Sequence, residues 1–196
     1  MELNIMATTT IAPTTAKPEK RLMSAAEFYD YCCLHGFNYE LVKGEVREVS
    51  PAGRTHGRII ARLGSRIQTH VETQRLGEVN IDVGYILETD PGYVRAPDIA
   101  FISAARLTPP EKRGFAALIP DLAVEVVSPT DSYGDLVEKA GQYFEAGVKE
   151  VWIVNDSTKS VEVFHTPDEA RILHASDALE TPLLPGLRIP VDEIFA

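Results

Sequence analysis

Hydrophobic and polar residues alternate with different periods along the first third of the chain. A capping-box pair, Ser24 and Glu27, opens a segment that ends in glycine, which predicts a helix over residues 24–36. Residues 37–50 then alternate with a period of two on both sides of a Lys-Gly pair, which predicts a hairpin.

A longer helix is predicted over residues 54–77, because apolar residues recur there at helical spacing. Its apolar stripe consists of Ile59, Ile60, Leu63, Ile67 and Val71. Apolar segments then predict strands at 78–88, 94–103, 121–128, 149–156 and 159–166, with a third helix at 135–147. This order predicts a mixed α/β (α+β) domain built around one sheet with helices packed on it.

The domain organisation follows from composition. Residues 1–20 are rich in Thr, Ala and Pro and lack the regions of a secretory signal, so we expect a flexible tail. Residues 21–196 are expected to form a single domain with a real core, since 44% of the 196 residues are hydrophobic. No apolar run approaches the roughly 18 residues of a membrane span, so no membrane association is expected.

Charge and cysteine content narrow the class of protein. The net charge of −10 argues against a general nucleic-acid coat protein, although it is compatible with a local basic surface. Cys32 and Cys33 are adjacent, and we expect buried or half-buried residues of the first helix rather than a disulfide or metal ligands. A reducing, cytoplasmic location fits this pattern best.

One carboxylate stands inside the most apolar predicted strand. Glu125 is surrounded by Leu, Ala and Val, where an isolated ionised acid is costly unless it is paired or bound to metal. Asp98 holds a similar place in the preceding strand. If the two strands are adjacent and in register, the acids converge, and they repel unless a proton or a cation lies between them. Mg²⁺ is the natural cation because it prefers oxygen ligands.

Each of these residues also has an ordinary explanation. Asp98 or Glu125 taken alone is equally well explained by a loop cap or an arginine partner, so the pair is the more informative observation. Lys139 flanks the apolar stripe of the third helix, and its stem could run along apolar surface to bring the ammonium to the acids. A solvated helix lysine is the alternative.

An ordered set of motifs resembles one family. "PD" at 97–98, "VEVVSP" at 124–129, a helix with Lys139 and "YFEAGVKEVWIVN" at 143–155 are similar to the Uma-type endonucleases of the PD-(D/E)XK, restriction endonuclease-like superfamily. The resemblance extends over "YELVKGEV" at 39–46, "RTHGRI" at 54–59 and "LLPGLRIPVDEIF" at 183–195. It implies a restriction endonuclease-like fold, with a central mixed sheet, flanking helices and an N-terminal hairpin.

The resemblance also assigns roles to single residues. The superfamily pattern places a Lys two residues after the strand Glu, but Val127 stands there, and the resemblance implies that Lys139 has taken over this position. It suggests that Glu40 joins the site as a further ligand or water holder, whereas a surface glutamate is the alternative. His56 could contact a phosphate or a water on the metal, although histidines at helix starts are more often structural.

The implied reaction is hydrolysis of DNA phosphodiester bonds with Mg²⁺ or Mn²⁺. Asp98 and Glu125 would bind the ion, with the backbone carbonyl of Val126 as a further candidate ligand. Lys139 would hold or deprotonate the attacking water and neutralise charge on the phosphate, and Glu40 would complete or orient the shell.

A basic surface is predicted on the second helix. Residues 43–75 hold seven basic and three acidic side chains, a local charge of +4. Arg54, Arg58, Arg62 and Arg66 recur every four residues and should form one ridge, which suits a DNA backbone. Arg54 and Arg58 are candidate substrate contacts, and a solvated helix face without a partner is the alternative.

Three functions therefore stay open. The first is a Mg²⁺-dependent DNA endonuclease, and the second is a catalytically inactive restriction endonuclease-like module that binds nucleic acid or protein, which Val127 favours. The third is a metal-dependent hydrolase of another phosphate ester. Restriction-like nucleases commonly pair to cut two strands, so we expect a homodimer, with the strands at 151–156 and 160–165 offering apolar edges.

Overall fold

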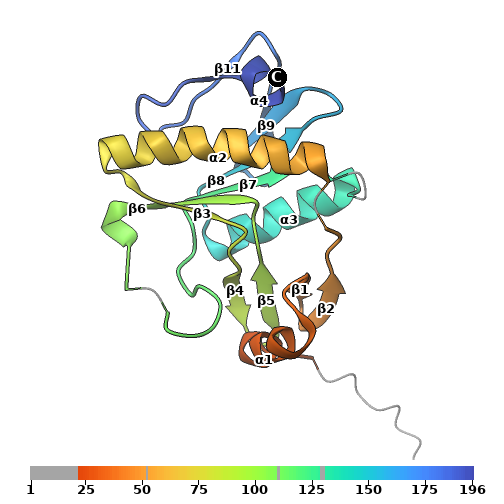
Figure 1. Ribbon diagram of the computed structural model, residues 1–196. Helices are drawn as coiled ribbons and strands as arrows, with labels where there is room; N and C mark the ends of the chain where they lie inside the picture. Colours follow the sequence, from red (N-terminus) through yellow and green to blue (C-terminus); the bar gives the residue numbers. More distant parts are fainter. Residues whose placement is uncertain (1–21, 52, 110, 129–130) are drawn as a thin grey trace, which may run out of the picture.

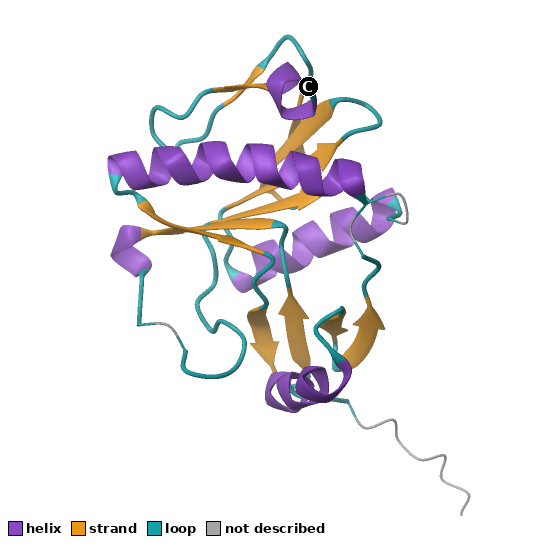
Figure 2. Ribbon diagram, viewed as in Figure 1, coloured by secondary structure: helices purple, strands orange, loops and turns teal. Residues whose placement is uncertain are grey.

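Two larger β-sheets, a two-stranded ribbon and a set of helices make up the part of the chain that is described (Figures 1 and 2). A computed structural model describes residues 22–51, 53–109, 111–128 and 131–196, so the predicted tail at 1–20 lies outside it. The helices are α1 (Ala25–His35), α2 (Arg54–Gln74), α3 (Tyr133–Ala146), α4 (Val191–Phe195) and the 3₁₀ helix η1 (Ala104–Arg106). No helix within these described ranges has the length and apolar character needed to cross a bilayer.

The larger sheet has six strands in the order β10-β9-β8-β7-β6-β3. These strands are β3 (Gly77–Ile81), β6 (Ile99–Ser103), β7 (Leu122–Val126), β8 (Glu150–Asn155), β9 (Ser160–Thr166) and β10 (Glu169–Leu173). β7 and β8 run parallel and the other neighbours run antiparallel, so the sheet is mixed, as expected. α3 forms the crossover that a parallel pair requires.

Helices cover both faces of this sheet. Figure 1 shows α2 across one face and α3 across the other. Alternation along β7 sends its even-numbered residues into the core beneath α2 and α4, and Ala123 into the core beneath α3. Glu125 shares the face of Ala123, as the alternation predicted, and its carboxylate therefore meets side chains of α3.

The smaller sheet contains the predicted hairpin. Its order is β2-β1-β5-β4, with strands β1 (Tyr39–Val42), β2 (Glu45–Glu48), β4 (Tyr85–Thr89) and β5 (Gly92–Arg95). Lys43 and Gly44 both adopt positive φ at the hairpin turn. α1 packs Phe28 and Cys32 against this sheet. A short ribbon of β11 (Ala178–Leu179) and β12 (Ile189–Pro190) follows the larger sheet.

Local sequence signals explain where the first and third helices begin and end. Ser24 and Glu27 form the reciprocal hydrogen bonds of a capping box, so this prediction is confirmed. α3 begins after Ser132, whose hydroxyl accepts from the N–H of Asp135, and it ends at Gly147 in the left-handed conformation.

Two predicted strands are divided between the two sheets. Residues 78–88 form β3 and then β4, and residues 94–103 form β5 and then β6. The expectation of one sheet was therefore wrong, because each segment was interpreted as one continuous strand although Gly84 and Pro97 interrupt them. Asp98 consequently lies just before β6 rather than within a strand.

Other expectations also needed correction. α2 ends at Gln74 instead of Gly77, because Arg75 turns into the left-handed conformation. The strands predicted as edges, β8 and β9, lie inside the larger sheet, whose edges are β10 and β3. Cys32 is buried as expected, whereas Cys33 is exposed.

Candidate active site

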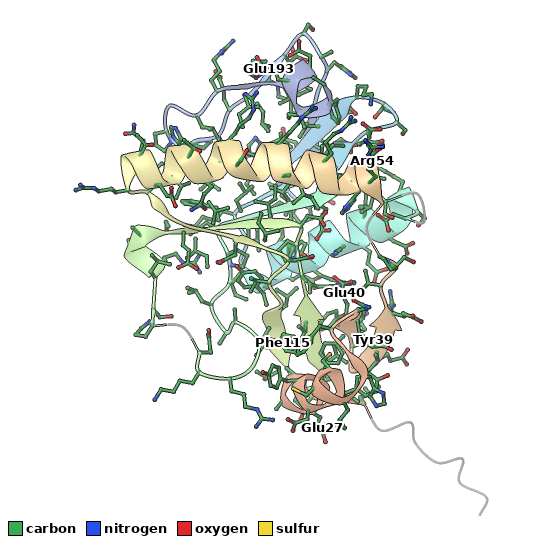
Figure 3. The ribbon with its side chains drawn as sticks, viewed as in Figure 1. Glu27, Tyr39, Glu40, Arg54, Phe115 and Glu193 are labelled. Carbon is green, nitrogen blue, oxygen red and sulfur yellow. The ribbon has the colours of Figure 1, made fainter. Side chains whose placement is uncertain are left out.

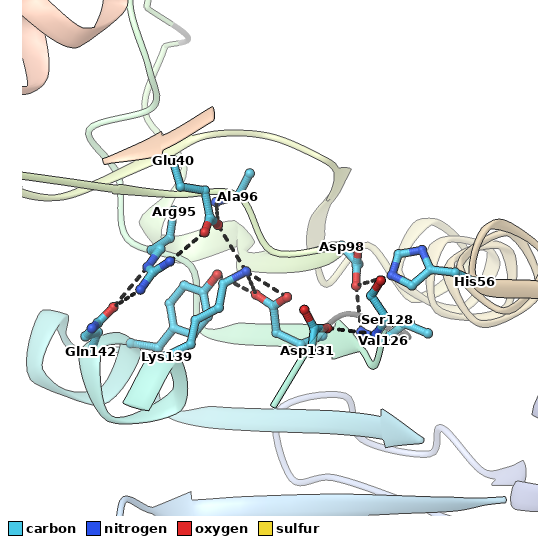
Figure 4. A network of polar contacts seen from close by, with 12 residues as sticks. Glu40, His56, Arg95, Ala96, Asp98, Val126, Ser128, Asp131, Lys139 and Gln142 are labelled. Atoms are coloured by element: carbon cyan, nitrogen blue, oxygen red, sulfur yellow. Dashed lines mark hydrogen bonds and ion pairs between the residues drawn. The ribbon is translucent and has the colours of Figure 1, made fainter. Parts of the chain in front are cut away.

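The predicted acids lie near the junction of the two sheets. β6 pairs with β7 so that Ile99 is opposite Val124, which places Asp98 across from Glu125. Asp98 accepts a 2.6 Å hydrogen bond from the N–H of Val126 (Figure 4). The prediction that these strands are neighbours in register is confirmed, and the two acids come from adjacent backbones.

Glu125 is a buried carboxylate with two partners on α3. The Tyr143 hydroxyl donates a 2.7 Å hydrogen bond to it, and the Lys139 ammonium lies 2.9 Å from it. Burial raises the pKa of Glu125 to about 7, with the charges of Asp98 and Glu40 adding to the rise and Lys139 opposing it. Glu125 is thus the acid that would gain most from an additional cation.

Lys139 reaches the site from the helix, as predicted. Its ammonium lies between Glu125 and Glu40, at 2.9 and 3.0 Å, and its side chain is 16% exposed. Burial would lower the pKa of Lys139, but the two carboxylates outweigh burial and raise it, so the amine stays charged. Val127 is half-buried and packs against the core beneath α3.

Glu40 approaches the same ammonium from the smaller sheet. It lies at the end of β1 that faces α3 (Figure 3). Arg95 and Lys139 donate to its two oxygens, and the N–H of Ala96 donates to one of them at 3.3 Å. Burial acts to raise the pKa of Glu40, but the charges of Lys139 and Arg95 lower it. Two cations already neutralise Glu40, whereas Glu125 has one cation and a neutral hydroxyl, so the geometry favours Glu40 as an acid that holds Lys139 over a direct metal ligand.

His56 contacts Asp98 from the first turn of α2. Its Nε2 lies 3.3 Å from Asp98 Oδ2, and this hydrogen bond raises the pKa of His56 against the effect of burial. Its Nδ1 is buried and has no hydrogen-bond partner among the described residues. His56 therefore orients Asp98, and its contact with a phosphate stays a prediction.

The arginine ridge on α2 is only partly available to a ligand. Arg54 (Figure 3) is exposed at the end of the helix that holds His56, and Arg58 is exposed one turn further along α2. Arg62 is half-buried, and Arg66 is paired with Glu193 of α4. The first two arginines are thus the better candidates for contacts with a nucleic-acid backbone.

Four residues of the site were not found from the sequence pattern. Arg95 donates to Glu40 and to Gln142, and Tyr143, expected only as a core residue, also donates to Glu125. Asp82 lies in the crossing between β3 and β4, and burial together with Asp98 raises its pKa. The available signal was a polar side chain within an apolar segment, which Arg95 and Gln142 both show.

The donor set fits a hard cation that keeps several waters. No group of three or more His, Cys, Asp or Glu side chains suited to hold a metal occurs in the described ranges, so an all-protein cage is absent there. Asp98 and Glu125 supply two carboxylates, which is the number that Mg²⁺ commonly takes from a protein. Four carboxylates of the site face two permanent cations, namely Glu40, Asp82, Asp98 and Glu125 against Lys139 and Arg95.

The fold and this site define a class of protein. Asp98 just before β6 and Glu125 on the neighbouring β7 correspond to the acids of the restriction endonuclease-like pattern. The lysine beside Glu125 is Lys139 of α3, because Val127 stands at the usual lysine position. The family model described as "Putative restriction endonuclease" (Uma2) matches residues 25–192, and the chain belongs to this family. No curated protein matches the chain.

Solved structures agree with this fold. A crystal structure titled as a putative nuclease belonging to DUF820, from Anabaena variabilis, matches with a TM-score of 0.73 and 20% sequence identity. The match covers 88% of this chain and 97% of that chain. At this identity the likeness establishes the restriction endonuclease-like fold and nothing about the reaction.

Proposed function

We propose that the chain is a Mg²⁺-dependent endonuclease that hydrolyses DNA phosphodiester bonds, with Mn²⁺ as a substitute ion. Family membership supports a nuclease. The observation that most supports an active site is the position of Lys139, whose ammonium lies 2.9 Å from Glu125 although Val127 occupies the usual lysine position. Burying this charge is costly, and charged groups of this kind gather at functional sites.

The proposed roles of the side chains follow from their contacts. Asp98 and Glu125 would hold the ion, which supplies Lewis acidity toward the phosphate and the attacking water. Lys139 donates hydrogen bonds to the charge that develops on the phosphate. Tyr143 and His56 keep the two acids oriented, and Glu40 holds Lys139 from the opposite side.

Metal binding and cleavage can be measured on the same samples. Mg²⁺ and Mn²⁺ are titrated by calorimetry into the wild type, Asp98→Ala and Glu125→Ala, and plasmid DNA cleavage is assayed in parallel. We expect binding and cleavage by the wild type and loss of both in the variants. Asp192→Ala, which removes an exposed acid of α4, should retain both. A wild type without metal binding contradicts the proposal.

A catalytically inactive binding module is the second candidate, because Val127 departs from the superfamily pattern. It predicts DNA or protein binding without cleavage under any metal. A third outcome, cleavage of small phosphodiesters but not of DNA, would assign the site to another phosphate ester.

A further inference from the structure

Three buried side chains and the half-buried Lys139 connect α3 to the smaller sheet in a closed ring. Lys139 Nζ lies 3.0 Å from Glu40, and Arg95 Nη1 donates to the other oxygen of Glu40. The Nε and Nη2 of Arg95 donate to Gln142 Oε1 at 2.9 and 2.7 Å. Gln142 follows Lys139 by three residues on α3, so the ring returns to the helix where it began (Figure 4). We call these four residues the Arg95 ring.

The ring is shielded from water. Arg95 is 5% exposed, and Glu40 and Gln142 are each 8% exposed. Charges in such surroundings interact more strongly than on a surface, and each unpaired group is costly. A change at Arg95 should therefore be felt by Glu40 and by any group that shares Glu40.

Lys139 is the group that shares Glu40. Its single ammonium lies between two carboxylates at nearly equal distance, 3.0 Å from Glu40 and 2.9 Å from Glu125. Arg95 neutralises Glu40 from the far side, and its own positive charge repels the ammonium toward Glu125. If Arg95 were removed, Lys139 would be the only cation left in the ring to neutralise Glu40.

We propose that Arg95 is a positioning residue that acts through Glu40 to keep the Lys139 ammonium at Glu125. Gln142 fixes the guanidinium by accepting two of its hydrogen bonds, a geometry that a lysine does not reproduce. The consequence for turnover rests on the proposed function, but the placement of Lys139 does not.

A double-mutant cycle tests the placement without metal or DNA. The coupling between Lys139→Met and Glu125→Gln is measured by urea unfolding of the metal-free protein, in the wild-type background and in Arg95→Met. We expect the unfolding equilibrium constants to show a coupling of about tenfold in the wild type and about twofold in Arg95→Met. An undiminished coupling in Arg95→Met overturns the proposal.

The same coupling is also measured in a second mutant background, which provides the test if the Arg95→Met variant does not fold. Glu40→Gln combined with Arg95→Met removes both charges of this ion pair, so neither is left buried and unpaired. It also removes the carboxylate that competes for Lys139. The coupling should return to about its tenfold value there, whereas a purely structural role of Arg95 predicts a persistent loss. Arg113→Met, which breaks an exposed pair with Asp30, serves as the control and should leave the coupling unchanged.

Turnover supplies a separate readout. In an active nuclease, Arg95→Met should lower kcat about tenfold while KM changes less than about twofold, because the placed amine acts on the transition state. A coupling that behaves as expected in a protein without nuclease activity would support the positioning role and refute the proposed function. Failure of the positioning role and failure of the proposed function therefore give different experimental results.

Discussion

Single atoms decide whether the buried acid at Glu125 can be tolerated. The Tyr143 hydroxyl and the Lys139 ammonium both lie within hydrogen-bonding distance, yet burial still raises the pKa of Glu125 to about 7. The residue is therefore compensated only in part by the protein. A site with an incompletely compensated buried carboxylate is suited to a further cation or to a substrate whose binding changes the local charge.

Lys139→Met tests the contribution of the amine at the residue scale. Methionine keeps the apolar stem but removes the charge, so we expect kcat to fall by about 10²- to 10³-fold, the size typical of losing one transition-state donor. Circular dichroism and thermal unfolding should still report a folded protein. Lys112→Met makes the same change at an exposed lysine outside the site and should cleave DNA at the wild-type rate. Equal turnover in both variants would refute the assigned role.

The residues of the site were predictable to different degrees. The pattern singled out Asp98 and Glu125 as acids in apolar segments, and Lys139 was a candidate from its place beside an apolar stripe together with the resemblance to the Uma-type family. Arg95 and Gln142 were not predicted, because they come into contact only where β5 of the smaller sheet lies against α3, the helix that packs on the larger sheet. No spacing along the chain encodes that encounter.

At the scale of elements, one acid anchors the start of β7. Asp121 accepts from the N–H of Ser103 and from Arg106 and Lys149 at 2.7–2.8 Å. It thereby joins the ends of β6 and η1 to the segment before β8. Burial acts to raise the pKa of Asp121, but the hydrogen bonds from Lys149, Ser103 and Arg106 lower it to about 2.

The stability of the fold should consequently depend on pH in the acid range. The folded-state pKa of Asp121 lies below its unfolded value of 3.8, so its contribution is present above about pH 4 and is lost as the pH falls toward 2. The shift corresponds to about 2 kcal/mol of unfolding free energy. Asp121→Asn should remove this part of the pH dependence in urea unfolding between pH 2 and 5, whereas Asp192→Asn should retain it. Parallel profiles for all three proteins would refute the assignment.

The ridge on α2 makes a prediction about nucleic-acid binding. Arg54 and Arg58 are exposed beside His56, whereas Arg66 is engaged with Glu193. Alanine at Arg54 or Arg58 should each reduce the salt dependence of DNA affinity by about one unit in the slope of log K against log salt. Binding is measured by fluorescence anisotropy across salt concentrations with a catalytically inactive Glu125→Gln protein. Arg188→Ala, at an exposed arginine paired with Glu180, should leave the slope unchanged.

The elements themselves were predicted better than their arrangement. The first and third helices and the hairpin carry explicit start, stop and turn residues, so each appears close to its expected place. The two crossings near Asp82 and Asp98 hold Gly84 and Pro97, but these residues were interpreted as parts of continuous strands rather than as breaks. The division into two sheets is set by packing against α1 and α3, which a local pattern does not record.

At the scale of the whole molecule, the site depends on both sheets being held together. Asp98 and Glu125 belong to the larger sheet, Glu40 and Arg95 belong to the smaller one, and Lys139 and Gln142 of α3 bridge them. The proposed chemistry therefore requires the two chain crossings near Asp82 and Asp98, which the predicted strands did not include as breaks. Each chain offers one such asymmetric site in its described residues, whereas duplex DNA presents two antiparallel strands.

A symmetric dimer would match that duplex, since a twofold axis presents one equal site to each strand. We expect light scattering to give about 43 kDa, twice the chain mass of 21.6 kDa, at the concentrations used for cleavage. The dimer should not form through the β10 edge of the larger sheet, because β10 is short, exposes Glu169 and Arg171, and has a register shift between Glu169 and Ala170. On supercoiled plasmid a dimer should yield linear product early, whereas single chains accumulate nicked circles first. A mass of 21.6 kDa together with persistent nicked circles would show that one chain acts alone.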